Sequence, residues 1–134
     1  MMECPNTAAA LAALIILCTP MAADAGQAAA DQGADHGADR GAALYEQRCT
    51  GCHSLDANRV GPSHRGVVGR KAGSVAGFAY SPAVKAADLV WTEDNLDRWL
   101  TDPQAVIPGQ RMNVRIGDAA VRAAIIAFLK RQSP

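Results

Sequence analysis

Apolar residues in the second half of the chain recur at helical spacing, and no stretch alternates between apolar and polar residues as a β-strand would. Thr92 is followed by two acidic residues, which predicts the capped first turn of a helix. Leu96, Trp99 and Leu100 share one face of that helix, and Pro103 predicts its end. The clearest element of the chain is therefore a short amphipathic helix.

Further helices are predicted from shorter signals. Asp118 caps the last one, whose final turn is basic. Ser81 and Pro82 predict a small helix, because serine caps well and proline suits the first helical position. Residues 41–48, GAALYEQR, form a helical run that would not persist unless it docked on another element. The apolar face of the last helix comprises Val121, Ile125 and Phe128. We predict an all-α fold with three to four short helices.

Long loops rich in glycine and proline join these helices. The stretch GPSHRGVVGRKAGSVAGFAY has neither helical nor strand periodicity, and the whole chain holds only two Trp, two Tyr and two Phe. Long structureless loops are unusual in so small a domain. They become reasonable if they wrap a rigid apolar group that supplies the missing buried surface. The pattern predicts a bound cofactor.

The N-terminal segment is typical of an export signal. An apolar run, AAALAALIILC, is followed by a Thr-Pro step and by small residues, with an Ala-x-Ala site at Ala23–Ala25. We predict a signal peptide over 1–25, although it has no Lys or Arg before its apolar run. The alternatives are an uncleaved anchor, for which the run is short, and a lipoprotein signal at Cys18. Residues 26–40, rich in Ala, Asp and Gly, are predicted to be a disordered acidic linker.

The zero net charge of the whole chain conceals two regions of opposite sign. Ala22 to Arg40 has four acidic residues and one basic residue, whereas the chain from Gly41 onward has twelve basic and eight acidic residues. The basic excess of the second region is small and evenly spread, which argues against nucleic-acid binding. It suits a transient contact with an acidic protein surface.

The stretch Cys49-Thr50-Gly51-Cys52-His53 carries the most specific chemistry of the chain. Cys4 and Cys18 would leave with the leader, so a mature chain would have two cysteines, both in this motif. A redox dithiol site needs a βαβ context, which is not predicted, and zinc needs more ligands than His64 could add. Two thiols at this spacing suit thioether bonds to the vinyl groups of one haem, with the next imidazole on its iron. Haem attachment is the favoured interpretation, and zinc and dithiol chemistry remain as alternatives.

The opposite ligand of the iron would decide the function. The candidates are Met112, His64 and an open position. Met112 is the only methionine after the leader and lies in a polar loop, IPGQRMNV, where core packing is a poor explanation for it. A thioether ligand raises the reduction potential and occupies the position that oxygen or peroxide would need. Met112 as ligand therefore predicts electron transfer.

From Gly41 to Arg131 the chain resembles a class I cytochrome c, in the branch of bacterial proteins similar to mitochondrial cytochrome c. The resemblance rests on the motifs GAALYEQRCTGCH, GPSHRGVVGRKAG, GFAYSPAVK, VWTEDNLDRWLTDP, IPGQRM and AFLKR, all in the family's order. It implies a cytochrome c domain over 41–134 that wraps one covalent haem c. It also implies that Gly41 and Tyr45 lie where the first helix crosses the last one near Phe128.

The resemblance implies a role for each site residue. Cys49 and Cys52 would be the thioether attachments, with His53 and Met112 as the two iron ligands. The Pro62 carbonyl would accept a hydrogen bond from His53. The remaining members of the implied haem-binding set are Arg70, Tyr80 and Trp91 at the propionates and Trp99 beside the methionine sulfur.

Four positions depart from the family's pattern. His64 stands where a leucine commonly packs on the haem, and it is expected to be either a surface residue or a pH-sensitive neighbour of the haem. Val84 replaces a frequent asparagine, Trp99 replaces a tyrosine, and Val114 replaces an aromatic residue over the haem edge. These changes predict a distal side with fewer hydrogen bonds.

We therefore predict a one-electron carrier, not an enzyme, that is exported to the periplasm or tethered to a membrane facing it. Its partners would be redox proteins with acidic docking surfaces, and a membrane would be involved only if the N-terminal segment is retained. The alternatives are a dedicated haem c subunit of a periplasmic dehydrogenase and a haem sensor or peroxidase. The candidate docking residues are Arg65, Arg70, Lys71, Arg111 and Arg115.

Overall fold

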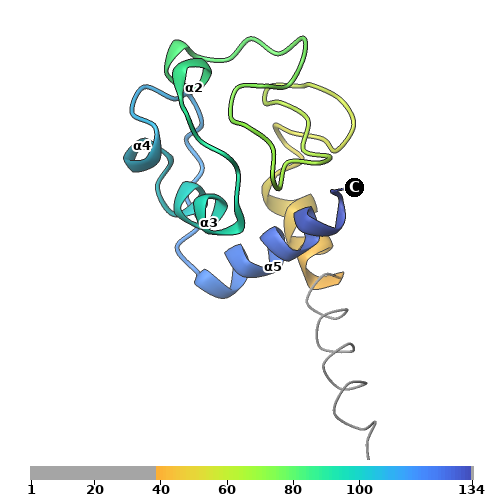
Figure 1. Ribbon diagram of the computed structural model, residues 1–134. Coiled ribbons are helices and arrows are strands. Elements are labelled where there is room, and N and C mark those ends of the chain that lie inside the picture. The colour runs from red at the N-terminus through yellow and green to blue at the C-terminus, as the bar shows by residue number, and fades with distance from the viewer. Residues whose placement is uncertain (1–38, 134) are drawn as a thin grey trace, which may run out of the picture.

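The computed structural model describes residues 39–133, and all of its regular elements are helices. A helical segment over residues 39–48 is followed by α2 (Pro82–Ala86), α3 (Glu93–Thr101), α4 (Pro103–Val106) and α5 (Ala119–Arg131). Helix α5 runs along one edge, α2 to α4 lie at one side, and the long loops of residues 49–81 form the other side (Figure 1). Among the described residues, the only ladder contact is one antiparallel bridge, Lys71 with Val90. The all-α prediction is confirmed.

The helix starts lie where the capping signals predicted them. Ser81 Oγ accepts from the N–H of Val84 at 3.3 Å, and Thr92 Oγ1 accepts from Asn95 at 3.2 Å. Asp118 Oδ1 accepts from Ala120 at 2.8 Å. Each bond satisfies an N–H group that has no partner inside its own helix.

Helix α4 was not predicted, so the described residues contain five helical segments where three to four were expected. Pro103 does follow the end of α3, but it also occupies the first turn of α4. Asp102 caps that turn by accepting from the N–H of Gln104 at 3.1 Å. A proline after a helix predicts its end, and the same residue is favourable at the start of the next one.

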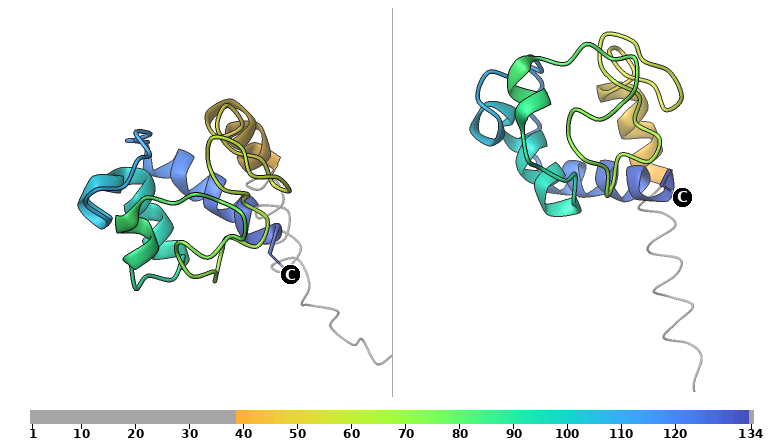
Figure 2. Two further views of the ribbon diagram at one scale, coloured as in Figure 1. Left: turned by 90° about the horizontal axis from the view of Figure 1, so that it is seen from above. Right: turned by 45° about the horizontal axis from the view of Figure 1, so that its top comes forward.

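The N-terminal helical segment packs across α5 at very short range. A Cβ on Gly41 would lie 2.0 Å from the carbonyl oxygen of Ala124, so only glycine permits this approach. Tyr45 is 4% exposed, and its ring lies 5.1 Å from that of Phe128. The predicted crossing of the first and last helices is present, and in Figure 2 the helical segment of residues 39–48 lies against α5.

Residues 39 and 40, which the sequence analysis placed in the linker, are helical in the structure. The predicted signal peptide and the rest of the predicted linker lie outside the described residues. Within residues 39–133, no helix has both the length and the apolar character needed to cross a membrane.

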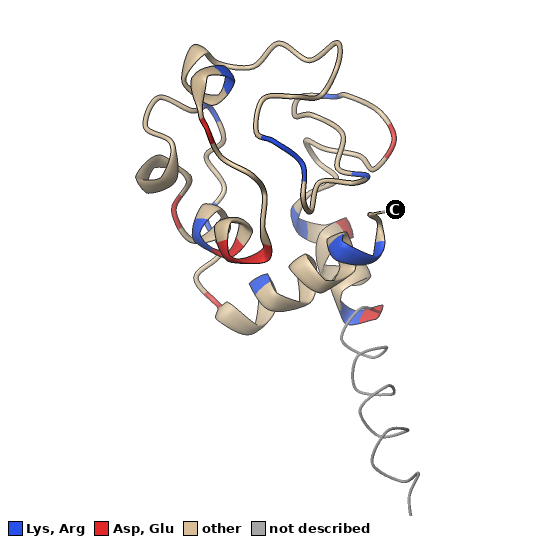
Figure 3. Cartoon of the chain, viewed as in Figure 1, with Lys and Arg blue, Asp and Glu red and all other residues tan. Residues whose placement is uncertain are grey.

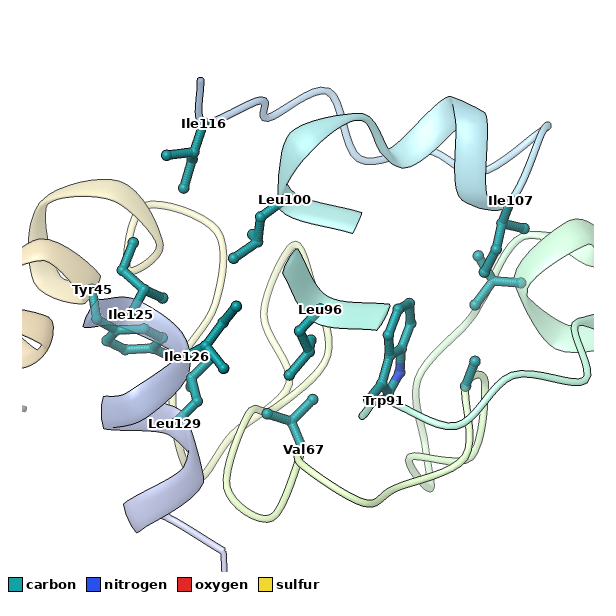
Figure 4. Close-up of a cluster of buried hydrophobic side chains, with 12 residues drawn as sticks. Tyr45, Val67, Trp91, Leu96, Leu100, Ile107, Ile116, Ile125, Ile126 and Leu129 are labelled. Atoms are coloured by element: carbon teal, nitrogen blue, oxygen red, sulfur yellow. The ribbon is translucent and has the colours of Figure 1, made fainter. Parts of the chain in front are cut away.

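The buried apolar side chains form a shell around an internal cavity. Ile125 is completely buried, and Leu96, Leu100 and Leu129 are 5%, 8% and 4% exposed. Figure 4 shows these side chains converging from α3 and α5. All four also line the cavity, as do Val67, Trp91 and Ile116. The chain thus packs around a space, in keeping with the expectation that a cofactor completes the core.

Candidate functional site

The cavity has a volume of about 650 Å³, which lies within the range of small-molecule and cofactor sites. Its wall is predominantly apolar. All nine residues predicted for the site line it: Cys49, Cys52, His53, Pro62, Arg70, Tyr80, Trp91, Trp99 and Met112. We call residues 49–67 the proximal wall and residues 107–118 the distal loop. The helices and loops of the chain form a ring, and these two segments lie on opposite sides of it (Figures 1 and 2).

Both cysteines are free thiols at the end of the N-terminal helical segment. The N–H groups of Cys52 and His53 both bond the carbonyl of Cys49, at 3.1 and 2.8 Å, so the chain turns tightly around this residue. Burial raises the pKa of the Cys49 thiol to about 11, which disfavours the thiolate that dithiol exchange requires. The described residues also contain no group of three or more His, Cys, Asp or Glu side chains that could hold a metal. Neither alternative to haem attachment gains support.

His53 is held in one tautomer. Its Nδ1 lies 2.8 Å from the carbonyl oxygen of Pro62 and donates to it, because a carbonyl can only accept. The lone pair therefore remains on Nε2, the nitrogen that a metal would need. Burial lowers the pKa of His53, which favours the neutral ring, although the bond to Pro62 opposes that shift. Gly61 packs against the ring so closely that a Cβ would lie 2.1 Å from His53 Cε1.

His64 is not the surface residue of the first expectation; it lines the cavity, as the second expected of a neighbour of the haem, but without the pH sensitivity. Its ring is stacked on that of His53, with centroids 4.0 Å apart and planes at 21°, so it is not a surface residue. Its Nδ1 lies 3.1 Å from the hydroxyl of Tyr45. Burial, followed by the charges of His53 and Arg70, lowers the pKa of His64 to about 3, so it does not titrate near neutral pH. Because it shares the side of His53, it is also a poor candidate for the opposite ligand.

Met112 is half-buried, and its backbone is bound by a neighbouring side chain. The Gln110 amide accepts from the N–H of Met112 and donates to its carbonyl, the latter at 2.7 Å. Gln110 itself is 5% exposed. Gln104 extends the arrangement by accepting from Gly109 N–H at 3.2 Å and donating to the Gln110 carbonyl at 3.3 Å. The sequence analysis missed both glutamines, since nothing in a polar loop indicates which amide is buried.

The far end of the distal loop is tied to α3 and α5. Ile116 N–H donates to the Leu100 carbonyl at 2.8 Å. The guanidinium of Arg122 donates to the carbonyls of Ile116 and Gly117 at 2.9 and 3.0 Å. The same guanidinium pairs with Asp97 at 2.7 Å. The segment that carries Met112 is therefore held at both of its ends.

The three residues predicted to bind propionates lie together in the cavity wall. Arg70 donates to the carbonyls of Ser63 and Arg65 at 2.7 and 3.0 Å, which fixes its guanidinium. Trp91 is 9% exposed and meets Trp99 edge to face, with centroids 5.0 Å apart. Tyr80 is half-buried, and its hydroxyl accepts from the N–H of Val75 at 3.3 Å. A fixed cation and two aromatic groups with polar tips suit a buried carboxylate.

The donor set fits a haem. One wall supplies two thiols and an imidazole whose Nε2 is available for a metal, and the other supplies a thioether. The apolar side chains between the two walls would cover the faces of a flat ring. The residues present can thus hold the group covalently, bind its iron from both sides and neutralise its carboxylates.

Comparisons with known proteins agree with this assignment. Residues 38–133 match the sequence model of the family described as Cytochrome c. The chain is 47% identical over 85 residues to cytochrome c2 iso-2 of Magnetospirillum fulvum, which covers 61% of this chain and 88% of that protein. It is 42% identical over 87 residues to the cytochrome c-type cyt cy of Rhodobacter capsulatus, covering 63% of this chain and 44% of that protein. Among solved structures, cytochrome cH from Methylobacterium extorquens superposes with a TM-score of 0.67 and 40% identity, over 70% of this chain and 97% of that one.

Proposed function

This chain belongs to the cytochrome c family, and on that premise we propose that it is an exported one-electron carrier in which His53 and Met112 bind the haem iron. Haem c is bound covalently through Cys49 and Cys52, the cysteine pair of the motif. The iron supplies the chemistry when bound, by exchanging one electron between its ferric and ferrous states. The protein's own residues bind, orient and enclose it.

His53 would act as a neutral nitrogen ligand of fixed orientation. Its bond to the Pro62 carbonyl places the proton on Nδ1 and increases the basicity of Nε2. Met112 would provide a neutral, soft sulfur that favours the reduced metal. A chain that keeps both ligands in both redox states has little to reorganise when an electron arrives or leaves. The same closure leaves no position for oxygen or peroxide, which argues for a carrier and against an oxygen-using enzyme.

Arg70, Tyr80 and Trp91 would offset the charge of the two propionates. Arg70 is half-buried and already anchored by two backbone carbonyls, so its charge does not need to be ordered on binding. The donors of Tyr80 and Trp91 would satisfy carboxylate oxygens that lose water on burial. Trp99, which meets Trp91 edge to face, would close the cavity beside the methionine.

Docking would be transient and electrostatically steered by an acidic partner. Lys and Arg are spread over loops and helices, and no single basic face stands out (Figure 3). Arg65, Lys71 and Arg115 pair with Asp56, Asp88 and Asp102 respectively, which reduces their contribution. Arg111 is exposed at the cavity and has no acidic partner among the described residues. We assign the main steering role to Arg111.

The N-terminal segments would direct the export of the domain. Residues 1–25 would act as the signal peptide and residues 26–38, most of the predicted linker, as a solvated acidic spacer in front of the folded domain. In the oxidising periplasm, an unoccupied cysteine pair would tend to close into a disulfide. Attachment of haem to both cysteines would prevent that closure. Retention of the leader would give a tethered carrier on the same side of the membrane.

The single observation that carries the proposal is the convergence of the motif, His53 and Met112 on one cavity. The test is expression with a haem-maturation system, followed by absorption spectroscopy and potentiometry of the wild type and Met112→Ala. We expect the variant to lose the weak red sulfur-to-ferric-iron band and to fall in reduction potential. Gly117→Ala is the control and should keep both properties, because Gly117 lies exposed in the same loop, does not line the cavity, and a Cβ there would meet nothing within 4 Å. An unchanged Met112→Ala spectrum would exclude Met112 as a ligand.

A further inference from the structure

A second imidazole lies face to face with the one that the proposed function assigns to the iron. The rings of His53 and His64 are 4.0 Å apart at their centroids and nearly parallel at 21°. That separation is van der Waals contact between two flat groups. Rotation of His53 about an axis through Nε2 would drive one ring edge into His64.

Two other contacts of His53 restrict rotation of its ring less than His64 does. The hydrogen bond from Nδ1 to the Pro62 carbonyl fixes the tautomer, but a carbonyl oxygen accepts over a broad range of directions. The backbone of Gly61 lies so close to the ring that a Cβ on this residue would come within 2.1 Å of His53 Cε1. The ring therefore cannot move toward that backbone. A flat neighbour on the face of the ring adds what these two contacts lack, which is resistance to rotation.

His64 is itself held in place. Its Nδ1 lies 3.1 Å from the Tyr45 hydroxyl, and its backbone N–H donates to the Ser54 carbonyl at 2.9 Å. The Tyr45 ring meets that of His64 edge to face at 5.7 Å and also packs on Phe128. Tyr45 belongs to the helix that crosses α5 at Gly41. A continuous line of contacts thus runs from the helix crossing to the face of His53.

We propose that His64, held by Tyr45, is a positioning residue that sets the plane of the His53 ring over the haem. The inference rests on the proposed function, because it requires His53 to be the iron ligand. A leucine at this position would fill space but present no flat face and make no hydrogen bond with Tyr45. The plane of an axial imidazole determines the orientation of the half-filled orbital of low-spin ferric iron, so the effect is visible in magnetic spectra.

The experiment compares the ferric holoprotein of the wild type with His64→Leu, His64→Phe and Tyr45→Phe. Electron paramagnetic resonance gives the g values, and proton NMR gives the paramagnetically shifted haem methyl signals. We expect His64→Leu to shift the g values and to change the pattern of methyl signals. His64→Phe restores a flat face but not the bond to Tyr45, so it should shift the signals less than His64→Leu does. Tyr45→Phe removes only the hydroxyl and should shift the signals in the direction of His64→Leu, by a smaller amount.

Val90→Ala is the control, because Val90 is 44% exposed and does not line the cavity, and it should leave every signal unchanged. Wild-type spectra in His64→Leu would overturn the inference, as would equal shifts in His64→Leu and His64→Phe. If neither histidine variant acquires haem, Tyr45→Phe decides, and unchanged signals there overturn the inference. The proposed function fails separately, if the wild type has no low-spin ferric spectrum or Met112→Ala leaves it unaltered.

Discussion

The proximal wall and the distal loop hold their proposed iron ligands in different ways. On the proximal wall, the contacts are made to the ring of His53 itself, by the Pro62 carbonyl, Gly61 and His64. On the distal loop, the hydrogen bonds are made to the backbone of Met112, through the amide of Gln110. An imidazole has a plane that must be set, whereas a thioether on a flexible stem needs only to reach the metal. Each ligand is held at the part that determines its geometry.

The two regions also differ in how firmly they are packed. Arg111, Asn113 and Val114 are exposed on either side of Met112, and Val114 retains 37% of its accessible surface. On the proximal wall, Gly61 and Val67 are buried, and His53 and His64 are half-buried. Segments with few buried apolar contacts open at lower free energy than the global unfolding. We expect the distal ligand to be released before the proximal one under mild denaturation.

The largest effect should come from Gly61→Ala. A Cβ would lie 2.1 to 2.6 Å from three atoms of the His53 ring, so either the ring or the backbone must move. Overpacking of this kind costs about 3 kcal/mol of folding free energy, and the displaced imidazole should give an altered ferric spectrum. Urea unfolding and absorption spectra of the holoprotein provide the measurement.

The matched control for that variant is Gly51→Ala. Gly51 lies in the haem-attachment motif, but a Cβ there would meet nothing within 4 Å. Its stability and spectrum should stay close to those of the wild type. Equal behaviour of the two alanine variants would show that the approach of Gly61 to the ring is not required.

Gln110→Ala should weaken the distal side without disturbing the proximal one. The N–H and carbonyl of Met112 would lose their partner, at a cost of about 2 kcal/mol. We expect the red sulfur-to-iron band to disappear at a lower urea concentration than in the wild type, while the histidine-bound haem persists. Gln110→Glu keeps the acceptor for the Met112 N–H and loses the donor to its carbonyl. The urea concentration at which this variant loses the red band should therefore lie between those of Gln110→Ala and the wild type.

Gln104→Ala provides the comparison for the distal loop. Gln104 bonds the backbone of Gly109 and Gln110 but not that of Met112. Its effect on the red band should be smaller than that of Gln110→Ala. The reverse order would mean that the loop as a whole, and not the bonds to Met112, holds the ligand.

The smallest effect concerns Tyr45, the residue that anchors His64. Burial, and then nearby negative charge, raise the pKa of Tyr45 to about 12 from its ordinary value of 10.0. In the holoprotein Cys49 is a thioether without charge, so Glu46 and Asp56 supply that charge. The folded state therefore keeps the proton where the unfolded state has lost it. This contribution to stability is complete below pH 10 and is lost as the pH rises from 10 to 12.

Tyr45→Phe has no such proton, so its free energy of unfolding should fall less steeply with pH over that interval. Urea unfolding of the holoprotein at several pH values between 9 and 12, followed by circular dichroism, measures the two slopes. Parallel slopes would mean that Tyr45 ionises equally well in the folded and unfolded states.

Much of the fold could be predicted from local signals. Ser81, Thr92 and Asp118 cap helices within three residues of themselves, so their neighbours in the sequence are also their partners in the structure. Helix α4 could not be predicted, since Pro103 is equally consistent with the end of one helix and the start of another. In the structure, Pro103 both follows the end of α3 and begins α4.

The candidate site, like the fold, could be predicted from the sequence only in part. The nine predicted residues all line one cavity, because the motif and the family pattern name them without reference to their packing. His64 was misjudged, since a histidine between a serine and an arginine carries no sign of burial. Its partner Tyr45 lies 19 positions away and meets it only after the helix crossing has formed.

The chemistry of this protein was therefore determined by the sequence alone: two thiols and an imidazole at a spacing that suits one haem, and a single methionine beyond the leader. Those features follow from the order of residues along the chain, so they can be identified without knowledge of the fold. Only the tertiary structure decided how each ligand is supported, with His64 against His53 and Gln110 along the backbone of Met112. Support of that kind comes from the packing of segments against each other, and residue order does not specify it locally.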